Sequence, residues 1–218
     1  MKTQPANELR RRLGAFCLFA APLLMLAGDA LRIGAGAERA WLITFKLSFA
    51  LFVGAALAIV SMTSERADRA GLVGGALAVV GCLAGSGILT ATAVMSSFEA
   101  AALGEAAQRA VEVSMTNRGV GEYVILYPLP GLAFPAGFLV LSYALRRARV
   151  VGPAAAAALA LGALLFPVGR IGRVDAAVLA SGAAMSLGMA LVGWRLLRGG
   201  KEELARREAP AADLKFQI

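Results

Sequence analysis

The chain contains no histidine and only two cysteines among its 218 residues. Without histidine it cannot build a His-ligated haem, a His-based zinc site or a histidine-activated nucleophile. Cys17 and Cys82 both lie in apolar runs and form no CxxC pair, and a cysteine in such a run usually packs as a small hydrophobic residue. We therefore expect no metal site and no cofactor.

Several catalytic motifs are also missing from the sequence. There is no Gly-rich phosphate-binding loop followed by lysine, no paired aspartates of a metal-dependent lipid transferase, and no serine placed with a base. These absences favour a role other than catalysis.

Charged residues are scarce, at 17% of the chain, whereas 59% of the residues are hydrophobic. Soluble domains are nearer half apolar and a quarter charged. The mean hydropathy is +0.71, and the apolar residues form long continuous runs. This pattern predicts an all-α integral membrane protein. We expect one helical domain over residues 1–198 and a partly disordered cytoplasmic tail over residues 199–218.

About six of the apolar runs reach the ~20 residues that a helix needs to cross a bilayer. The predicted spans cover residues 13–33, 40–62, 71–95, 119–145, 151–174 and 175–197. The last two are so close that the intervening "GRIGRVD" must itself form the turn. The first run also resembles a secretory signal peptide, but it is long for a signal core, and we expect an uncleaved span.

The lysines and arginines of the loops predict the orientation. With the amino terminus inside, the inner segments hold 15 of the 22 basic residues and 7 of the 14 acidic ones, which accounts for the whole net charge of +8. Both termini are therefore expected in the cytoplasm, in the inner membrane of a bacterium. Because these basic residues flank spans and face anionic lipid headgroups, nucleic acid is not expected as a partner.

The segment at residues 96–118 is longer than the other connections and rich in alanine. Its apolar residues fall on one helical stripe, which most of its charged residues avoid. We predict an amphipathic helix on the outer membrane face, between the third and fourth spans.

Ionisable residues lie at a similar depth in four predicted spans. Lys46 is about six residues into the second span, or ~9 Å along its helix. The other three lie near the outer ends of the first, fourth and fifth spans: Asp29, Glu122 and Arg170. Because an unpaired charge in hydrocarbon costs several kcal/mol, we predict that the four pair as an ionic layer lined by Tyr123 and Tyr127. The alternative is unrelated interfacial charges, with Lys46 extending its ammonium toward the headgroups.

Proline and glycine mark two of the spans. Pro128, Pro130 and Pro135 interrupt the fourth span, which should kink or unwind near mid-membrane because proline removes a helical hydrogen bond. Transporters use such breaks as binding sites, but a packing kink is the alternative. In the third span, glycine pairs at positions 71/75 and 81/85 predict close helix contacts.

These features together predict a membrane protein whose outward-facing polar cavity binds or transports a small solute or ion. Lys46 and Arg170 would attract an anionic group. One alternative is a non-catalytic accessory subunit, which would use its charges as fixed pairs and contact a partner membrane protein or further copies of itself. A second is an enzyme acting on lipid headgroups, with Glu122 or Asp29 as general acid or base. The absence of metal-binding clusters makes it the weakest of the three.

Overall fold

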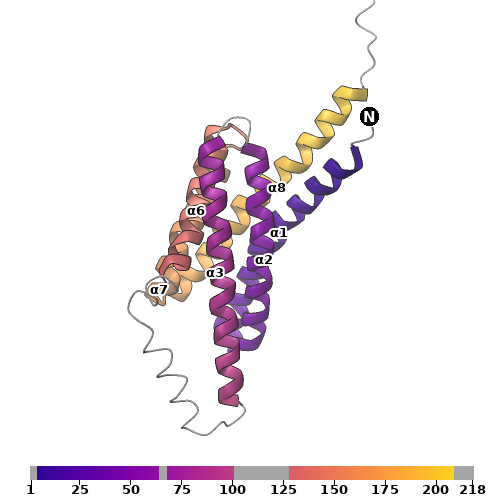
Figure 1. Cartoon of the computed structure of the whole chain (residues 1–218). Helices are drawn as coiled ribbons and strands as arrows, with labels where there is room; N and C mark the ends of the chain where they lie inside the picture. The colour runs from indigo at the N-terminus through magenta and orange to yellow at the C-terminus, as the bar shows by residue number, and fades with distance from the viewer. Residues whose placement is uncertain (1–3, 64–67, 101–127, 209–218) are drawn as a thin grey trace, which may run out of the picture.

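The computed structural model describes residues 4–63, 68–100 and 128–208 (Figure 1). Within these ranges the chain is helical and contains no strand, which confirms the predicted all-α class. The helices are α1 (Gln4–Ala35), α2 (Glu38–Thr63), α3 (Asp68–Ala100), α6 (Pro128–Arg147), α7 (Pro153–Gly172) and α8 (Asp175–Glu208).

Five of the described helices, α1, α2, α3, α7 and α8, are long and apolar enough to cross a membrane. Their apolar stretches contain 20 to 29 residues, and ~20 residues suffice. The fold is therefore that expected of a polytopic membrane protein. A sixth span at α6 and the cytoplasmic location of both termini stay predictions.

The helices contact one another in a closed ring. Each packs against the next in the order α1, α2, α3, α6, α7, α8, and α8 returns to α1. A smaller contact between α2 and α6 crosses the ring. The first turns of α1 and the last turns of α8 extend together beyond the other helices (Figure 1).

Phenylalanine rings fill the interior where α2, α6 and α7 meet. Phe52, Phe134 and Phe138 are at most 1% exposed, and their ring centroids lie 5.0 to 5.4 Å apart with edge-on geometry. Phe166 of α7 joins this group, 4.7 Å from Phe134. Each such pair adds about 0.5–1.5 kcal/mol beyond the burial of apolar area.

Glycine allows α3 and α6 to approach backbone to backbone. A Cβ atom on Gly81 would lie 2.3 Å from the backbone nitrogen of Phe134, and a Cβ on Gly137 would lie 2.3 Å from that of Ala78. A Cβ on Gly75 would lie 2.4 Å from the Cγ2 methyl of Val60 on α2, so this glycine accommodates a neighbouring side chain. The close contacts predicted for the third span are confirmed.

Two tight turns lie at the end of the bundle where α1 and α7 finish. Gly36 connects α1 to α2 with a φ of 60°, and Arg173 follows α7 with a φ of 54°. The Val174 amide donates to the Gly169 carbonyl oxygen at 2.9 Å, and α8 begins at the next residue, Asp175. The prediction that the last two spans are joined without a loop is confirmed.

The structure moves the ends of two predicted helices. α3 continues to Ala100, so residues 96–100 extend this helix, and the rest of the predicted surface helix, residues 101–118, lies outside the described residues. α8 continues through the predicted start of the tail to Glu208.

The three prolines of the predicted fourth span lie in α6. Pro128 and Pro130 are in the first turn of α6, where proline is tolerated because the amides there have no partner within the helix. Pro135 is the one proline inside α6, and the helix continues past it to Arg147. α6 is therefore helical from Pro128 to Arg147. The predicted kink or break stays a prediction, because the residues before Pro128 lie outside the described ranges.

Candidate functional site

Asp29 and Arg170 form an ion pair near the end of the bundle where α1 and α7 finish. The Arg170 Nη2 atom donates to Asp29 Oδ2 at 2.7 Å. Asp29 is 2% exposed, and the Arg170 side chain is 21% exposed. Because α8 separates α1 from α7 in the ring, the pair joins two helices that are not ring neighbours.

The second oxygen of Asp29 is bonded from a third helix. Trp41 of α2 donates its indole Nε1–H to Asp29 Oδ1 at 3.2 Å. Arg32 of α1 lies over the Trp41 ring, with its guanidinium carbon 4.6 Å from the ring centroid. A carboxylate removed from water needs such donors on both oxygens, and α2 and α7 supply one each.

Aromatic rings hold the Arg170 guanidinium in place. Its central carbon lies 4.7 Å from the centroid of Phe45 on α2 and 4.2 Å from that of Phe166, one turn earlier on α7. Cation–π contacts of this kind are worth about 2 kcal/mol when they are shielded from water. The Arg170 side chain is thus fixed by two rings and one carboxylate.

One donor nitrogen of this guanidinium, Nη1, is not used by any described residue. The Arg170 Nη1 atom is buried and has no hydrogen-bond partner in the described part of the protein. A buried donor without an acceptor costs about 1–3 kcal/mol, and Arg normally bonds carboxylates or phosphates with two nitrogens at once. Nη1 is therefore the group through which this cluster can bind a further acceptor.

Lys46 does not join the pair. The residue is exposed, and it is flanked on the same surface by Ile43, 69% exposed, and Leu47, 51% exposed. The side of α2 that faces the interior carries Phe45 and Phe49 instead, and Lys46 follows Phe45 by ~100° of helical rotation. The prediction that Lys46 points into the bundle is therefore corrected, and its position fits the snorkelling alternative.

The structure thus brings together two of the four predicted ionic residues, Asp29 and Arg170. Glu122, Tyr123 and Tyr127 lie outside the described residues, so the prediction for them stays open.

Sequence reasoning missed the aromatic partners of Arg170. Phe166 lies four residues before Arg170 on the same helix. Side chains at this spacing meet, so this contact could have been predicted from the sequence. Phe45 had none, because it lies on another helix and nothing in its local sequence indicates Arg170.

The cluster of Asp29, Arg32, Trp41, Phe45, Phe166 and Arg170, here called the arginine cluster, carries one net positive charge. It is suited to attract and orient an anionic group. Comparison with protein families, curated proteins and solved structures gave no match for this chain.

Proposed function

We propose that the protein binds a small anionic solute or ion at the arginine cluster and that it takes part in the transport of this solute across the membrane. The observation that carries the proposal is the Arg170 guanidinium, which is fixed by Asp29, Phe45 and Phe166 while its Nη1 has no acceptor among the described residues. Such a fixed, partly used guanidinium is pre-organised for a carboxylate or an oxyanion.

The charge balance supports an anion rather than a cation. Asp29 neutralises one positive charge, and both of its oxygens already accept hydrogen bonds from Arg170 and Trp41. A cation would have to displace one of these donors, whereas an anion would add a missing acceptor to Nη1. Since Nη1 is covered, binding requires a small movement of the side chains around it.

The orientation predicted from the loops makes this site outward-facing. The arginine cluster lies at the end that carries the α1–α2 and α7–α8 turns, opposite the first turn of α1. If the amino terminus is cytoplasmic, as the basic residues predict, the solute enters from outside. The exposed Lys46 would then add long-range attraction without direct contact.

Anion binding by the purified protein tests the proposal. Chloride, acetate, phosphate and sulfate are titrated in neutral detergent while thermal unfolding is followed, since a ligand that binds the folded state raises the unfolding temperature. We expect at least one of these anions to stabilise the wild type. The effect should disappear in the neutral-pair variant, Asp29→Asn/Arg170→Gln, which removes both charges without leaving one unpaired.

Two controls separate specific binding from general electrostatics. Arg39→Gln removes an exposed arginine of α2 near the same end and should keep anion stabilisation. Lys46→Ala should weaken it only slightly. A folded neutral-pair variant that responds to anions like the wild type would refute the proposal.

A fixed structural pair is the second candidate, and one observation favours it: the Asp29–Arg170 bond joins helices that are not ring neighbours. In this case the protein would be an accessory subunit. No anion should then stabilise the wild type, and loss of the pair should destabilise the fold. Catalysis by Asp29 is less well supported, because a carboxylate with both oxygens bonded is poorly placed to exchange protons with a substrate.

A further inference from the structure

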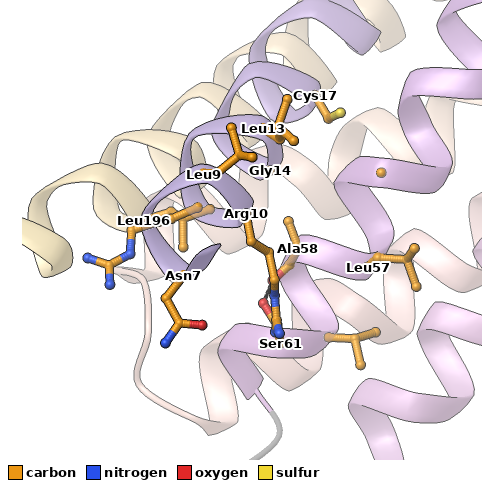
Figure 2. Close-up of a pocket in the computed structure, with 13 residues that line it drawn as sticks. Asn7, Leu9, Arg10, Leu13, Gly14, Cys17, Leu57, Ala58, Ser61 and Leu196 are labelled. Atoms are coloured by element: carbon orange, nitrogen blue, oxygen red, sulfur yellow. Dashed lines mark hydrogen bonds between the residues drawn. The ribbon is translucent and has the colours of Figure 1, made fainter. Parts of the chain in front are cut away.

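A groove lies near the opposite end of the bundle, where α1 begins and α2 ends (Figure 2). Its volume is about 1070 Å³, and it is lined by α1 and α2, with Leu196 of α8 on one side. It is separate from the arginine cluster, with which it shares no residue. We call it the α1–α2 groove.

The groove exists because small residues line the seam between two antiparallel helices. Gly14 faces Ala58 so closely that a Cβ on the glycine would lie 2.9 Å from the Ala58 Cβ. One turn deeper, a Cβ on Gly54 would lie 2.6 Å from the Cys17 sulfur. With no large side chains on the seam, the space between the flanking leucines stays open.

The lining has a polar zone and an apolar zone. The polar zone carries Asn7, Arg10 and Arg11 from α1 and Ser61 from α2, and it continues into an apolar zone that reaches Cys17 (Figure 2). From Arg10 to Cys17 the helix advances seven residues, or ~10 Å. The groove therefore runs from the polar end of the span into its apolar part.

The apolar zone is not covered by protein in the described part of the chain. Leu13 is 55% exposed and Leu57 58% exposed, and both line the groove. Both lie within stretches long and apolar enough to span a membrane. In a bilayer, a groove that is open sideways at this depth is reached by lipid hydrocarbon.

Arg10 is a cation available to a ligand. It is exposed, and no ion pair joins it to a described residue, whereas Arg12, two positions later, is paired with Glu8. Arg10 and Arg11 precede the apolar run that begins near Leu13, at the level where lipid phosphates lie. A phosphate is a preferred partner of arginine.

We propose that the α1–α2 groove is a binding site for one anionic phospholipid. Arg10 and Arg11 hold the phosphate, the polar side chains of Asn7 and Ser61 contact the headgroup, and an acyl chain lies along Leu13 and Leu57 toward Cys17. Charge complementarity selects an anionic headgroup, and the apolar zone selects a lipid over a free phosphate. The site is independent of the function proposed for the arginine cluster.

Cys17 provides a direct test in the wild-type protein. The protein is reconstituted into vesicles of phosphatidylcholine alone or of phosphatidylcholine with phosphatidylglycerol, and alkylation by N-ethylmaleimide is followed by mass spectrometry. We expect phosphatidylglycerol to slow the alkylation of Cys17. Cys82, which is 1% exposed on α3, is the internal control and should react slowly in both vesicles.

Matched arginine variants test the headgroup contact. Each arginine near an anionic surface contributes about fivefold in affinity, so Arg10→Gln/Arg11→Gln should weaken phosphatidylglycerol binding roughly 30-fold in a native mass spectrometry titration. Arg146→Gln/Arg147→Gln removes two exposed arginines from the last turn of α6. Since α6 lies across the ring from α1, this control should bind like the wild type.

Three results would overturn the proposal. The first is alkylation of Cys17 that is as slow in phosphatidylcholine alone as in vesicles with phosphatidylglycerol. The second is equally slow alkylation when inorganic phosphate is added to phosphatidylcholine vesicles. The third is unchanged phosphatidylglycerol binding by Arg10→Gln/Arg11→Gln. If that variant fails to fold, the wild-type comparison of the two lipids and phosphate decides alone. Neither arginine belongs to the arginine cluster, so a failure here leaves the anion-binding test unaffected.

Discussion

At the end of the bundle where α1 and α7 finish, Arg170 is packed between two aromatic rings and bonded to Asp29. At the other end, where α1 begins and α2 ends, Arg10 is exposed beside an open groove. We call these the paired end and the groove end. The same type of side chain therefore has two different roles. At the paired end the charge of Arg170 contributes to helix packing. At the groove end the charge of Arg10 is exposed to water and lipid headgroups.

The difference follows from how deeply the fold removes each guanidinium from water. An arginine within an apolar bundle needs a carboxylate and aromatic faces, since an isolated buried charge would cost many kcal/mol. An arginine at the interface needs none of these, because water and lipid phosphates solvate it. We therefore expect substitutions at the paired end to change the stability of the fold, and substitutions at the groove end to change its response to lipid.

The largest effect is expected for Asp29→Ala at the paired end. This substitution leaves Arg170 charged and without its carboxylate, and breaking a buried pair by removing one partner costs about 3–5 kcal/mol of unfolding free energy. The neutral-pair variant should lose less, because it leaves no unpaired charge. Unfolding in detergent, followed by circular dichroism, measures both. Equal losses in the two variants would mean that the pair does not act as a unit.

The apolar helices and two of their turns could be predicted from the sequence, but several helix ends could not. Continuous apolar runs identified the spans, "GRIGRVD" identified the α7–α8 turn, and the glycine pairs identified a tightly packed third span. The ring order could not be predicted, because hydropathy locates a span along the chain but says nothing about its neighbours. In lipid, apolar surfaces gain little by facing one another, so the order depends on local shape.

The site was predictable only in part, for a related reason. Depth counting selected Asp29 and Arg170, but it selected Lys46 equally. Whether Lys46 faces inward depends on the rotation of α2 about its axis, and in a membrane apolar residues can face either lipid or protein. The rotation is set by Phe45, Phe49 and Phe52, which pack inside the bundle. Their spacing was visible, but the sequence did not distinguish an interior stripe from a lipid-facing one.

Phe45→Leu should produce the second largest effect. It removes one of the two rings that contact the Arg170 guanidinium, and we expect a loss of about 2 kcal/mol of unfolding free energy. Phe16→Leu is the matched control, because Phe16 is 59% exposed and its replacement should change stability by no more than about 0.5 kcal/mol. Similar losses in the two variants would show that the Phe45 ring acts by volume alone.

A smaller loss is expected for Trp41→Phe, which removes the donor to Asp29 Oδ1 and keeps an aromatic face beneath Arg32. One hydrogen bond to a charged acceptor is worth about 1.5–3 kcal/mol at most, and ordinary ones about 1 kcal/mol. At 3.2 Å this bond is long, so we expect about 1 kcal/mol. In the neutral-pair background, where no carboxylate remains, the loss should shrink, and a double-mutant cycle measures this coupling. An unchanged loss would show that Trp41 stabilises the fold independently of Asp29.

The smallest effect on the bare protein is expected for Arg10→Gln at the groove end. Arg10 is exposed and forms no ion pair with a described residue. Such an arginine contributes within about 0.5 kcal/mol to stability, so the unfolding temperature of the variant in phosphatidylcholine should match that of the wild type. When phosphatidylglycerol is added, the wild type should gain stability by mass action and the variant should gain less. High salt should reduce this difference, because screening weakens exposed charges more than buried pairs. A large loss already in phosphatidylcholine would contradict the contrast between the two ends, since it would make Arg10 part of the packing, as Arg170 is.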